Sequence, residues 1–531
     1  MKTIYYNGDI ITVNDKNMFA QALCEENGKI TAVGSNEEIL SIKKDGDKLI
    51  DLKGKTMLPA FIDAHSHFTG YAHALEQCDL SNCKNFEDII DTMSNFINKN
   101  KFPSDKWIIG CNYDQNFLKE QKHPDRHTLD KISDTKPILI IHASSHMGVA
   151  NSKALEIQKI DENTKDFSNG RYAREENSLV PNGYMEEKAF LDFQSKIPTP
   201  SVENLLNLIN KAQNDYASYG IATVQEGMVA KPLFELLKYA SSSKVLKIDV
   251  IGFADIATAS DLFDKEPLYA NKYHNHFKLG GYKIFLDGSP QGKTAWMSKP
   301  YENEKDYCGY PICEDDELLK YIKLALNKKQ QLLAHCNGDQ AAEQYISQFE
   351  KALAEEKKSD CNRAVMVHAQ LVRKDQLKRM AKIGMMASFF VAHTYYWGDI
   401  HLKNFGQKRG SQISPVKDAL DLGVKFTFHQ DSPVVPPDML KTISCAVNRV
   451  SKSGKTIGEN QKTDVLNAIK AVTINAAYQY FEENEKGSIE VGKNADFVIL
   501  DNNPLSVDKN KIEKINVLET IKDGKVIFKS K

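Results

Sequence analysis

In the middle of the chain, short apolar runs alternate with amphipathic segments, and this alternation restricts the fold more than any other feature. The segment DDELLKYIKLALNKKQ stands before LLAH, and KDQLKRMAKIG stands before MMASFF. Apolar residues recur at helical spacing in the longer segments, whereas the short runs have the length of buried strands. Strands that alternate with helices are typical of a parallel sheet or barrel, so we expect an α/β fold.

Several of the predicted strands end on polar residues, as in FIDAHSH, ATVQEG, YKIFLDG, LLAHCNGD, VMVHAQ and KFTFHQDSP. His335 and His368 are 33 residues apart, which is about one strand–helix unit. His368 and Asp431 are 63 residues apart, about two units, with GMMASFF as the strand between them. In a barrel of this kind the carboxyl ends of the strands form the active face, so the function should be located there.

The two ends of the chain have a different texture from its middle. Asn7-Gly8, Asn27-Gly28 and Asp523-Gly524 each stand between β-forming residues, a pattern that predicts hairpins. We therefore expect the two terminal segments to pair into one small sheet domain.

One separation within the middle is too long for a single helix. His65 and Ala222, where the strand ATVQEG begins, are 157 residues apart. We infer an inserted subdomain at about 70–200.

The run MLPAFIDAHSHF, residues 57–68, ends with two histidines separated by one serine. His65 and His67 stand at i and i+2, so in a strand both imidazoles project from one face. Alone, the pair is equally consistent with two polar residues at a strand end. Four histidines and a carboxylate together suit Zn²⁺, and Mn²⁺, Fe²⁺ or Co²⁺ as well, whereas four buried imidazoles without a cation would be costly. The polar strand ends supply these partners, namely Lys283, His335, His368 and Asp431.

The bulk composition excludes several classes of protein. A formal net charge of −2 gives no basic field for nucleic acid or an anionic membrane. No segment has the roughly 18 uncharged apolar residues of a membrane span, and the N-terminus lacks the apolar core of a secretory signal. The nine cysteines include no CxxC pair, and an odd number argues against a disulfide framework. We expect a cytoplasmic protein that acts on a small molecule and by default forms a homodimer.

The ordered set of motifs resembles the amidohydrolase superfamily, in particular the YtcJ-like branch that includes the N-substituted formamide deformylases. The resemblance covers nearly the whole chain and lies in GKITAVG, LPAFIDAHSH, KIFLDGSPQGKTA, AHCNGDQA, QDSPVVPPDML, TINAAY and GSIEVGKNADFVIL. It implies a distorted TIM (β/α)₈ barrel beside a β-sandwich formed by both termini. The corresponding domain bounds are 1–57 and 481–531 for the sandwich and 58–480 for the barrel with its inserted subdomain.

The resemblance also implies roles for the polar residues at the strand ends. His65 and His67 would bind the more buried of two metal ions with Asp431, and His335 and His368 would bind the second. Lys283 would bridge the two ions as a carbamate, which requires a neutral amine. The alternative for this lysine is an ordinary salt bridge to Asp287. Asp431 would also act as general base and acid, taking a proton from metal-activated water and passing it to the leaving amine.

Residues that contact the substrate are predicted less directly. The candidates are His146, Tyr113, Asp114, His393 and Trp397, and each of them is equally consistent with ordinary packing.

Two further residues are expected to contact the metal-binding side chains without binding the metal themselves. Glu226 stands at the end of ATVQEG, and His429-Gln430 replaces the Gly-Ser that relatives commonly have before the aspartate. His429 shares a strand face with Asp431, so it could also compete as a metal ligand.

The predicted function is hydrolysis of a non-peptide C–N bond in a small amide, an N-substituted formamide or a cyclic amide. A metal-dependent esterase or isomerase on the same fold is an alternative. A metal-free scaffold protein is a third class, and the presence of all six polar strand-end residues argues against it.

Overall fold

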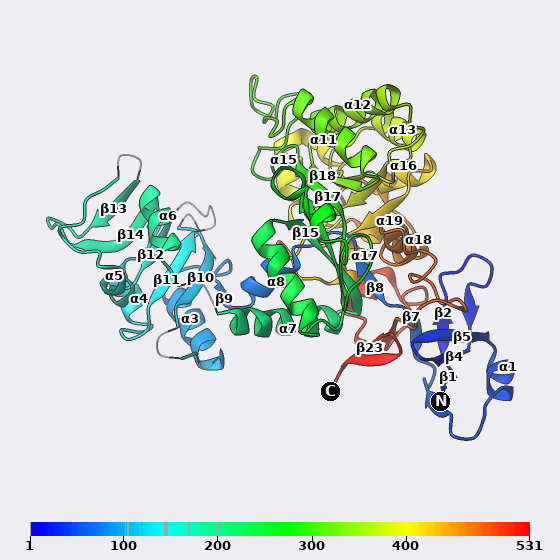
Figure 1. The fold of residues 1–531 in the computed structure, drawn as a ribbon. Helices are drawn as coiled ribbons and strands as arrows, with labels where there is room; N and C mark the ends of the chain where they lie inside the picture. Colours follow the sequence, from blue (N-terminus) through cyan, green and yellow to red (C-terminus); the bar gives the residue numbers. More distant parts are fainter. Residues whose placement is uncertain are drawn as a thin grey trace. The chain divides into compact units, whose positions relative to one another are not determined.

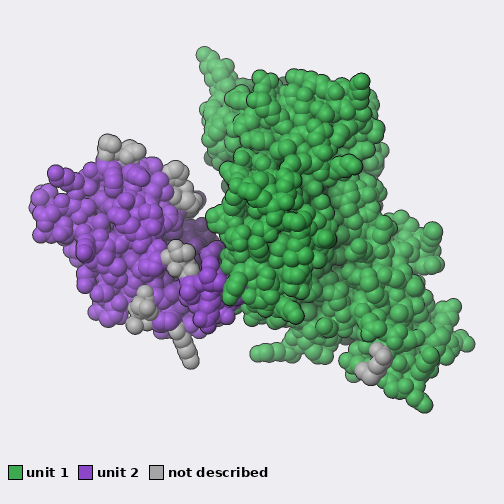
Figure 2. Space-filling view, viewed as in Figure 1, with its two compact units in different colours: residues 1–70, 209–531 green, residues 71–208 purple. Residues whose placement is uncertain are grey.

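The computed structural model describes residues 2–100, 102–103, 106–115, 117–142, 147–167, 170–198 and 201–531. The chain divides into two compact units (Figure 2). Unit 1 comprises residues 1–70 and 209–531, and unit 2 comprises residues 71–208. The helices α2 (Phe68–Ala74) and α7 (Val202–Ser218) contain the two boundaries.

Unit 1 is built around an eight-stranded sheet in which all paired neighbours are parallel (Figure 1). The strands follow one another in chain order around the sheet, as expected for a barrel. The predicted fold class, an α/β barrel with additional β-sheets, is therefore confirmed. The strands are β8 (Phe61–Asp63), β15 (Ile221–Val229), β16 (Asp249–Asp255), β17 (Phe277–Phe285), β18 (Gln331–Cys336), β19 (Val365–His368), β20 (Met386–Phe389) and β21 (Phe426–Phe428).

The barrel strands are buried on both faces, which explains their apolar runs. Ile62, Phe253, Leu333, Val367 and Tyr480 belong to one core cluster. The strand β16 is absent from the strands that the sequence analysis named.

Helices connect the barrel strands, and the two amphipathic segments identified from the sequence form α11 and α13. The connecting helices are α8 (Lys231–Ser242), α9 (Ile256–Ala259), α10 (Leu262–Lys265), α11 (Asp315–Asn327), α12 (Asp339–Glu356), α13 (Lys374–Ile383), α14 (His393–Tyr396), α15 (Gly398–Gly410) and α16 (Val416–Asp421). After the barrel come α17 (Met439–Asn448), α18 (Val465–Ala471) and α19 (Ile474–Gln479), with the 3₁₀ turns η1 (Glu459–Gln461) and η2 (Lys509–Lys514). Among the helices of the described residues, none is both long and apolar enough to cross a membrane.

The ends of the chain form two further sheets of unit 1, one from N-terminal strands alone and one from strands of both ends (Figure 1). One has the order β5 (Lys29–Gly34), β4 (Ala22–Glu26), β1 (Thr3–Tyr6), β6 (Lys48–Asp51), with α1 (Asn36–Ser41) beside it. The other has the order β24 (Lys525–Lys529), β23 (Val517–Lys522), β22 (Phe497–Leu500), β7 (Thr56–Pro59), β2 (Asp9–Ile11), β3 (Phe19–Ala20). The antiparallel pairing of β7 with β22 joins the two ends of the chain in one sheet. Tyr5, Leu23, Met57 and Phe497 share one core cluster drawn from both sheets.

Two of the three predicted hairpins form, and one prediction was wrong. Asn27-Gly28 joins β4 to β5, and Asp523-Gly524 joins β23 to β24. Asn7-Gly8, in contrast, leads from β1 in one sheet to β2 in the other. The Asn36 side chain and the Gln21 carbonyl accept the N–H groups of Asn7 and Gly8, so the turn directs the chain between sheets instead of back along β1.

Unit 2 contains a mixed six-stranded sheet covered by short helices. The strands lie in the order β13 (Gly170–Arg174), β14 (Pro181–Glu187), β12 (Met147–Ala150), β11 (Ile138–His142), β10 (Ile108–Tyr113), β9 (Gln77–Asp79). The helices are α3 (Phe86–Asn100), α4 (Arg126–Asp130), α5 (Ser152–Gln158) and α6 (Lys188–Ser195). Because β9, β10 and β11 are parallel, Tyr113 and His142 lie at the same edge of the sheet.

Candidate metal centre

The first and last strands of the barrel meet at residues that were predicted as metal ligands. The N–H of Asp431 donates to the carbonyl of His65 at 3.1 Å, and the N–H of His67 donates to the carbonyl of Ser432 at 2.8 Å. Asp431 has a φ of 55°, in the left-handed region that a non-glycine residue seldom adopts. Such strain persists where surrounding contacts enforce it and is common at functional sites.

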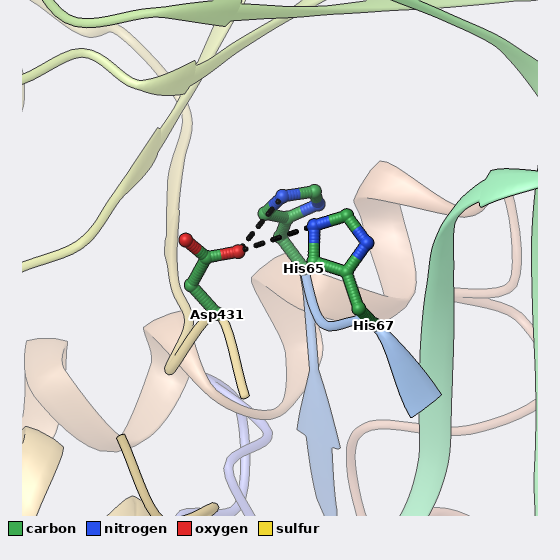
Figure 3. A group of neighbouring side chains, drawn as sticks. All are labelled: His65, His67 and Asp431. Atoms are coloured by element: carbon green, nitrogen blue, oxygen red, sulfur yellow. Dashed lines mark ion pairs between the residues drawn. The ribbon is translucent and has the colours of Figure 1, made fainter. Parts of the chain in front are cut away.

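Three side chains converge where the first and last strands of the barrel meet, the barrel seam (Figure 3). The Nε2 atoms of His65 and His67 lie 3.3 and 3.5 Å from Asp431 Oδ1. One ligand atom from each residue lies within 4.8 Å of the other two. Asp431 Oδ1 is buried and accepts no hydrogen bond from any described residue. Two imidazoles facing a carboxylate oxygen that lacks a hydrogen bond form a donor set that fits a divalent cation.

Lys283 reaches the same cluster from β17 and is fully buried. Its Nζ lies 3.4 Å from His65 Nε2. Burial lowers the pKa of this lysine to about 7, which favours the neutral amine that a carbamate needs. Within the described residues no ion pair joins Lys283 to Asp287, whose carboxylate instead accepts backbone N–H groups of Trp296, Asn337 and Gly338.

His335 and His368 form a second pair beside the first cluster. His335 Nδ1 and His368 Nε2 are 3.0 Å apart, and the rings of His65 and His368 have centroids 5.5 Å apart. Burial lowers the pKa of all four imidazoles below the ordinary value. Neutral imidazole is the form that binds a metal ion, so the electrostatics of the cluster also fit a cation.

The strand β15 supports the first cluster from behind. Gln225 Oε1 accepts the Nδ1–H of His65 at 2.5 Å, which leaves His65 Nε2 as the ring nitrogen with a lone pair. Glu226 accepts two hydrogen bonds from Thr69, from its N–H and from its hydroxyl, each of 2.7 Å. Glu226 thus holds the chain immediately after His67. A Cβ on Gly227 would lie 2.7 Å from His65 Cε1, so the absence of a side chain lets the ring approach the strand.

His429 follows β21 and is fully buried. Its Nε2 lies 3.1 Å from His368 Nδ1, and its Nδ1 lies 2.8 Å from the Ser388 hydroxyl. The sequence analysis did not identify Gln225 or Ser388. Gln225 adjoins the predicted Glu226, but its contact with His65 depends on which strands are neighbours.

The predicted substrate residues fall into three groups. His393 is buried and Trp397 half-buried, in the segment after β20. The His393 ring lies 4.3 Å from that of Phe390, which in turn lies 5.3 Å from that of His429.

The other candidates belong to unit 2 or lie outside the described part of the chain. The Tyr113 hydroxyl lies 3.1 Å from His123 Nδ1, and Asp114 Oδ1 lies 3.6 Å from His142 Nε2. His146 is not among the described residues.

Comparisons with known proteins agree with this architecture. The model of the amidohydrolase family matches residues 48–528. The protein YtcJ of Bacillus subtilis (strain 168) is 25% identical over 99% of this chain and 99% of its own length. An N-substituted formamide deformylase from Arthrobacter pascens is 26% identical over 98% of this chain and 96% of its own length.

A solved structure resembles nearly the whole chain as well. An uncharacterized metal-dependent hydrolase from Pyrococcus horikoshii OT3 has a TM-score of 0.78 and 26% identity, and the match covers 96% of this chain and 99% of that chain. Together with these similarities, the barrel and its histidine-rich strand ends define the class of protein as a hydrolase built on an α/β barrel. The chain belongs to the amidohydrolase family, as its motifs predicted.

Proposed function

We propose that the chain is a metal-dependent hydrolase of a non-peptide C–N bond in a small amide, an N-substituted formamide or a cyclic amide. The observation that supports this most directly is the convergence of His65, His67 and Asp431, with ligand atoms within 4.8 Å, at the barrel seam. The likeness to a protein named as a formamide deformylase and to one described as a metal-dependent hydrolase favours the same chemistry.

One or two zinc ions are the proposed cofactor. His65, His67 and Asp431 would hold the first ion, and His335 and His368 the second. Lys283 would bridge them as a carbamate, and its buried amine supports that role. A bound divalent cation supplies a Lewis acid that polarises the substrate carbonyl and lowers the pKa of water to about 7.

Asp431 is the proposed general base and acid. Its Oδ1 faces the two histidines, whereas its other oxygen points away from them (Figure 3). That second oxygen would take the proton of the attacking water and return it to the leaving amine. The amine then departs neutral, which an amide requires more than an ester does. His393 and Trp397 would line one wall of the substrate pocket, and Tyr113, Asp114 and His146 remain predicted substrate contacts.

The test combines metal analysis with a substrate panel. The purified chain is analysed for metal content, stripped with a chelator, and reloaded separately with Zn²⁺, Mn²⁺, Co²⁺ or Fe²⁺. N-substituted formamides, cyclic amides and the matching esters are then assayed. We expect about one or two ions per chain and hydrolysis of a C–N bond that is lost with the chelator and restored by metal. A chain that binds no cation under any condition would refute the proposal, and cleavage confined to esters would replace it with an esterase.

A further inference from the structure

His429 stands where it can orient a neighbouring histidine instead of binding a cation. Its two ring nitrogens face His368 Nδ1 at 3.1 Å and the Ser388 hydroxyl at 2.8 Å. All three side chains are buried, with exposed fractions of 0% for His429 and Ser388 and 3% for His368. Both nitrogens of His429 are thus engaged, and neither is left for a metal ion in this arrangement.

The pairing of the barrel strands fixes this row of side chains. His368 ends β19, Ser388 lies in β20, and His429 follows β21. In the sheet, Val367 pairs with Ser388, and Ser388 pairs with Thr427. Thr427 and His429 are two positions apart, so His429 lies on the same face as Ser388. His368 is one position beyond Val367 and pairs with Phe389, but its φ of 71° departs from the extended backbone and releases its side chain from the alternation of the strand. The Phe390 ring packs 5.3 Å from the His429 ring and helps to keep it in place.

Two proton arrangements satisfy the row, and only one of them suits a cation. In the first, His368 donates its Nδ1–H to His429, which donates its own Nδ1–H to the Ser388 oxygen. In the second, the serine hydroxyl donates to His429, whose Nε2–H donates to His368. A neutral imidazole carries one proton, so the second arrangement places it on His368 Nε2 and removes the lone pair on the side of His335. The first arrangement leaves that lone pair available, and His368 Nε2 already lies 3.0 Å from His335 Nδ1.

We propose that His429, backed by Ser388, is a positioning residue that holds His368 in the tautomer with Nε2 available to the second cation. Partners of this kind fix the ring orientation of a metal-binding histidine, and their loss typically weakens metal affinity by about 10–100-fold. The inference rests on the proposed function, because it presumes that His368 binds a cation.

The matched pair His429→Gln and His429→Asn distinguishes a positioning role of His429 from a role as a metal ligand. The terminal amide of glutamine reaches the place of Nε2 and keeps an acceptor for His368. The shorter asparagine reaches only the place of Nδ1 and keeps the contact with Ser388. Each full-length variant and the parent chain are stripped and titrated with Co²⁺ against a chromophoric chelator, and absorption spectra are recorded at each equivalent.

We expect H429N to weaken the second Co²⁺ equivalent about 10–100-fold, with the first equivalent within about 3-fold of the parent. H429Q should restore the second equivalent to within about 3-fold and keep the parent spectrum. Ser388→Ala removes the acceptor of His429 without changing the ring, and it should weaken the second equivalent several-fold. That variant gives an answer even where H429N does not fold.

Two results would overturn the inference. Unchanged affinities in both H429N and S388A would show that the row does not orient His368. Equal loss of one whole equivalent in H429N and H429Q would make His429 itself a ligand. A parent chain that binds no Co²⁺ would instead refute the proposed function, so the two failures are distinguishable.

Discussion

The backbone N–H of Asp431 donates to the carbonyl oxygen of His65 at 3.1 Å, and the side chains of the same two residues approach to 3.3 Å between Oδ1 and Nε2. The contact that joins the last barrel strand to the first is therefore also the centre of the candidate metal site. A cation held there would couple ligand binding to closure of the barrel, since a ligand that binds only the folded chain stabilises it.

Cation binding should raise the free energy of unfolding. At a free zinc concentration of 100 times the dissociation constant, the expected gain is about 2.7 kcal/mol. Urea unfolding with zinc and with a chelator measures it, and Asp431→Asn should lose most of the gain. Equal stabilisation of the parent and D431N would place the cation elsewhere.

Asp431→Asn should also lower kcat by about 10²–10⁴-fold, because asparagine cannot carry the proton from water to the leaving amine. Steady-state kinetics on the substrate found in the panel provides the measurement. Asp45→Asn, at an exposed position, serves as the control and should leave kcat unchanged. Comparable rates for D431N and the parent would contradict the assigned role.

Gly227→Ala should displace the two imidazoles of the candidate metal site. The added Cβ would lie 2.7 Å from His65 Cε1 and 3.0 Å from His67 Cε1, so both rings must move. Overpacking of this kind costs about 1–3 kcal/mol, and we expect metal content to fall as well. Gly70→Ala is the matched control, since its Cβ would be 3.4 Å or more from its neighbours. Metal analysis and thermal unfolding of both variants measure the loss of metal and the loss of stability.

Lys283 should make metal loading depend on carbon dioxide. A carbamate forms when the neutral amine attacks CO₂ and releases a proton, and burial of Lys283 favours that amine. Stripped protein reloaded with zinc in bicarbonate should regain more activity than protein reloaded in CO₂-depleted buffer. Lys283→Met should show no bicarbonate effect and retain less zinc. A parent chain that reloads equally well without CO₂ would exclude the carbamate.

A buried ion cluster links the barrel to the six-stranded terminal sheet of unit 1. The Asp249 carboxylate, at the start of β16, pairs with Lys486 at 2.5 Å and with Lys522, at the end of β23, at 3.0 Å. Burial alone would raise the pKa of Asp249, but the two ammonium groups hold it well below the ordinary value. Burial opposes charge on the two lysines as well, yet the Asp249 carboxylate raises the pKa of each.

The pH dependence of stability follows from these directions. The Asp249 pKa is depressed in the folded chain, so its contribution is present above the ordinary value of 3.8 and is lost as pH falls through the lower folded pKa. The lysine pKa values are raised, so their contribution is complete below 10.5 and is lost as pH rises through the higher folded values. Urea unfolding across pH should show a plateau between these limits.

Asp249→Asn should lower that plateau by about 3 kcal/mol, because it removes the carboxylate that the two buried ammonium groups share. Glu482 and Asp496, each 3.0 Å from one of these ammonium groups, remain as partners. Asp421→Asn breaks the exposed pair with Lys417 and should change stability by less than about 1 kcal/mol. Equal effects of the two substitutions would show that the buried cluster contributes no more than a surface pair.

Local patterns predicted a parallel sheet or barrel with polar residues at its strand ends, and the family resemblance implied the barrel. Strand and helix periods are properties of a few neighbouring residues, and parallel strands in a barrel place their carboxyl ends on one face, so His65 and His335 could be expected near each other. The Asn7-Gly8 hairpin prediction was wrong because a local pattern has a short range. Two residues specify a turn but not the sheet that the chain enters next.

The sequence by itself determined the alternation of elements and the residue types at the strand ends, because periodicity and turn chemistry act over short distances. Only the tertiary structure decided that Gln225 holds His65, that Ser388 and His429 stand behind His368, and that Asp249 meets Lys486 and Lys522. These contacts join segments up to hundreds of residues apart, and they depend on strand register and on which side chains lose their water together. No local pattern specifies the strand register or which side chains become buried together.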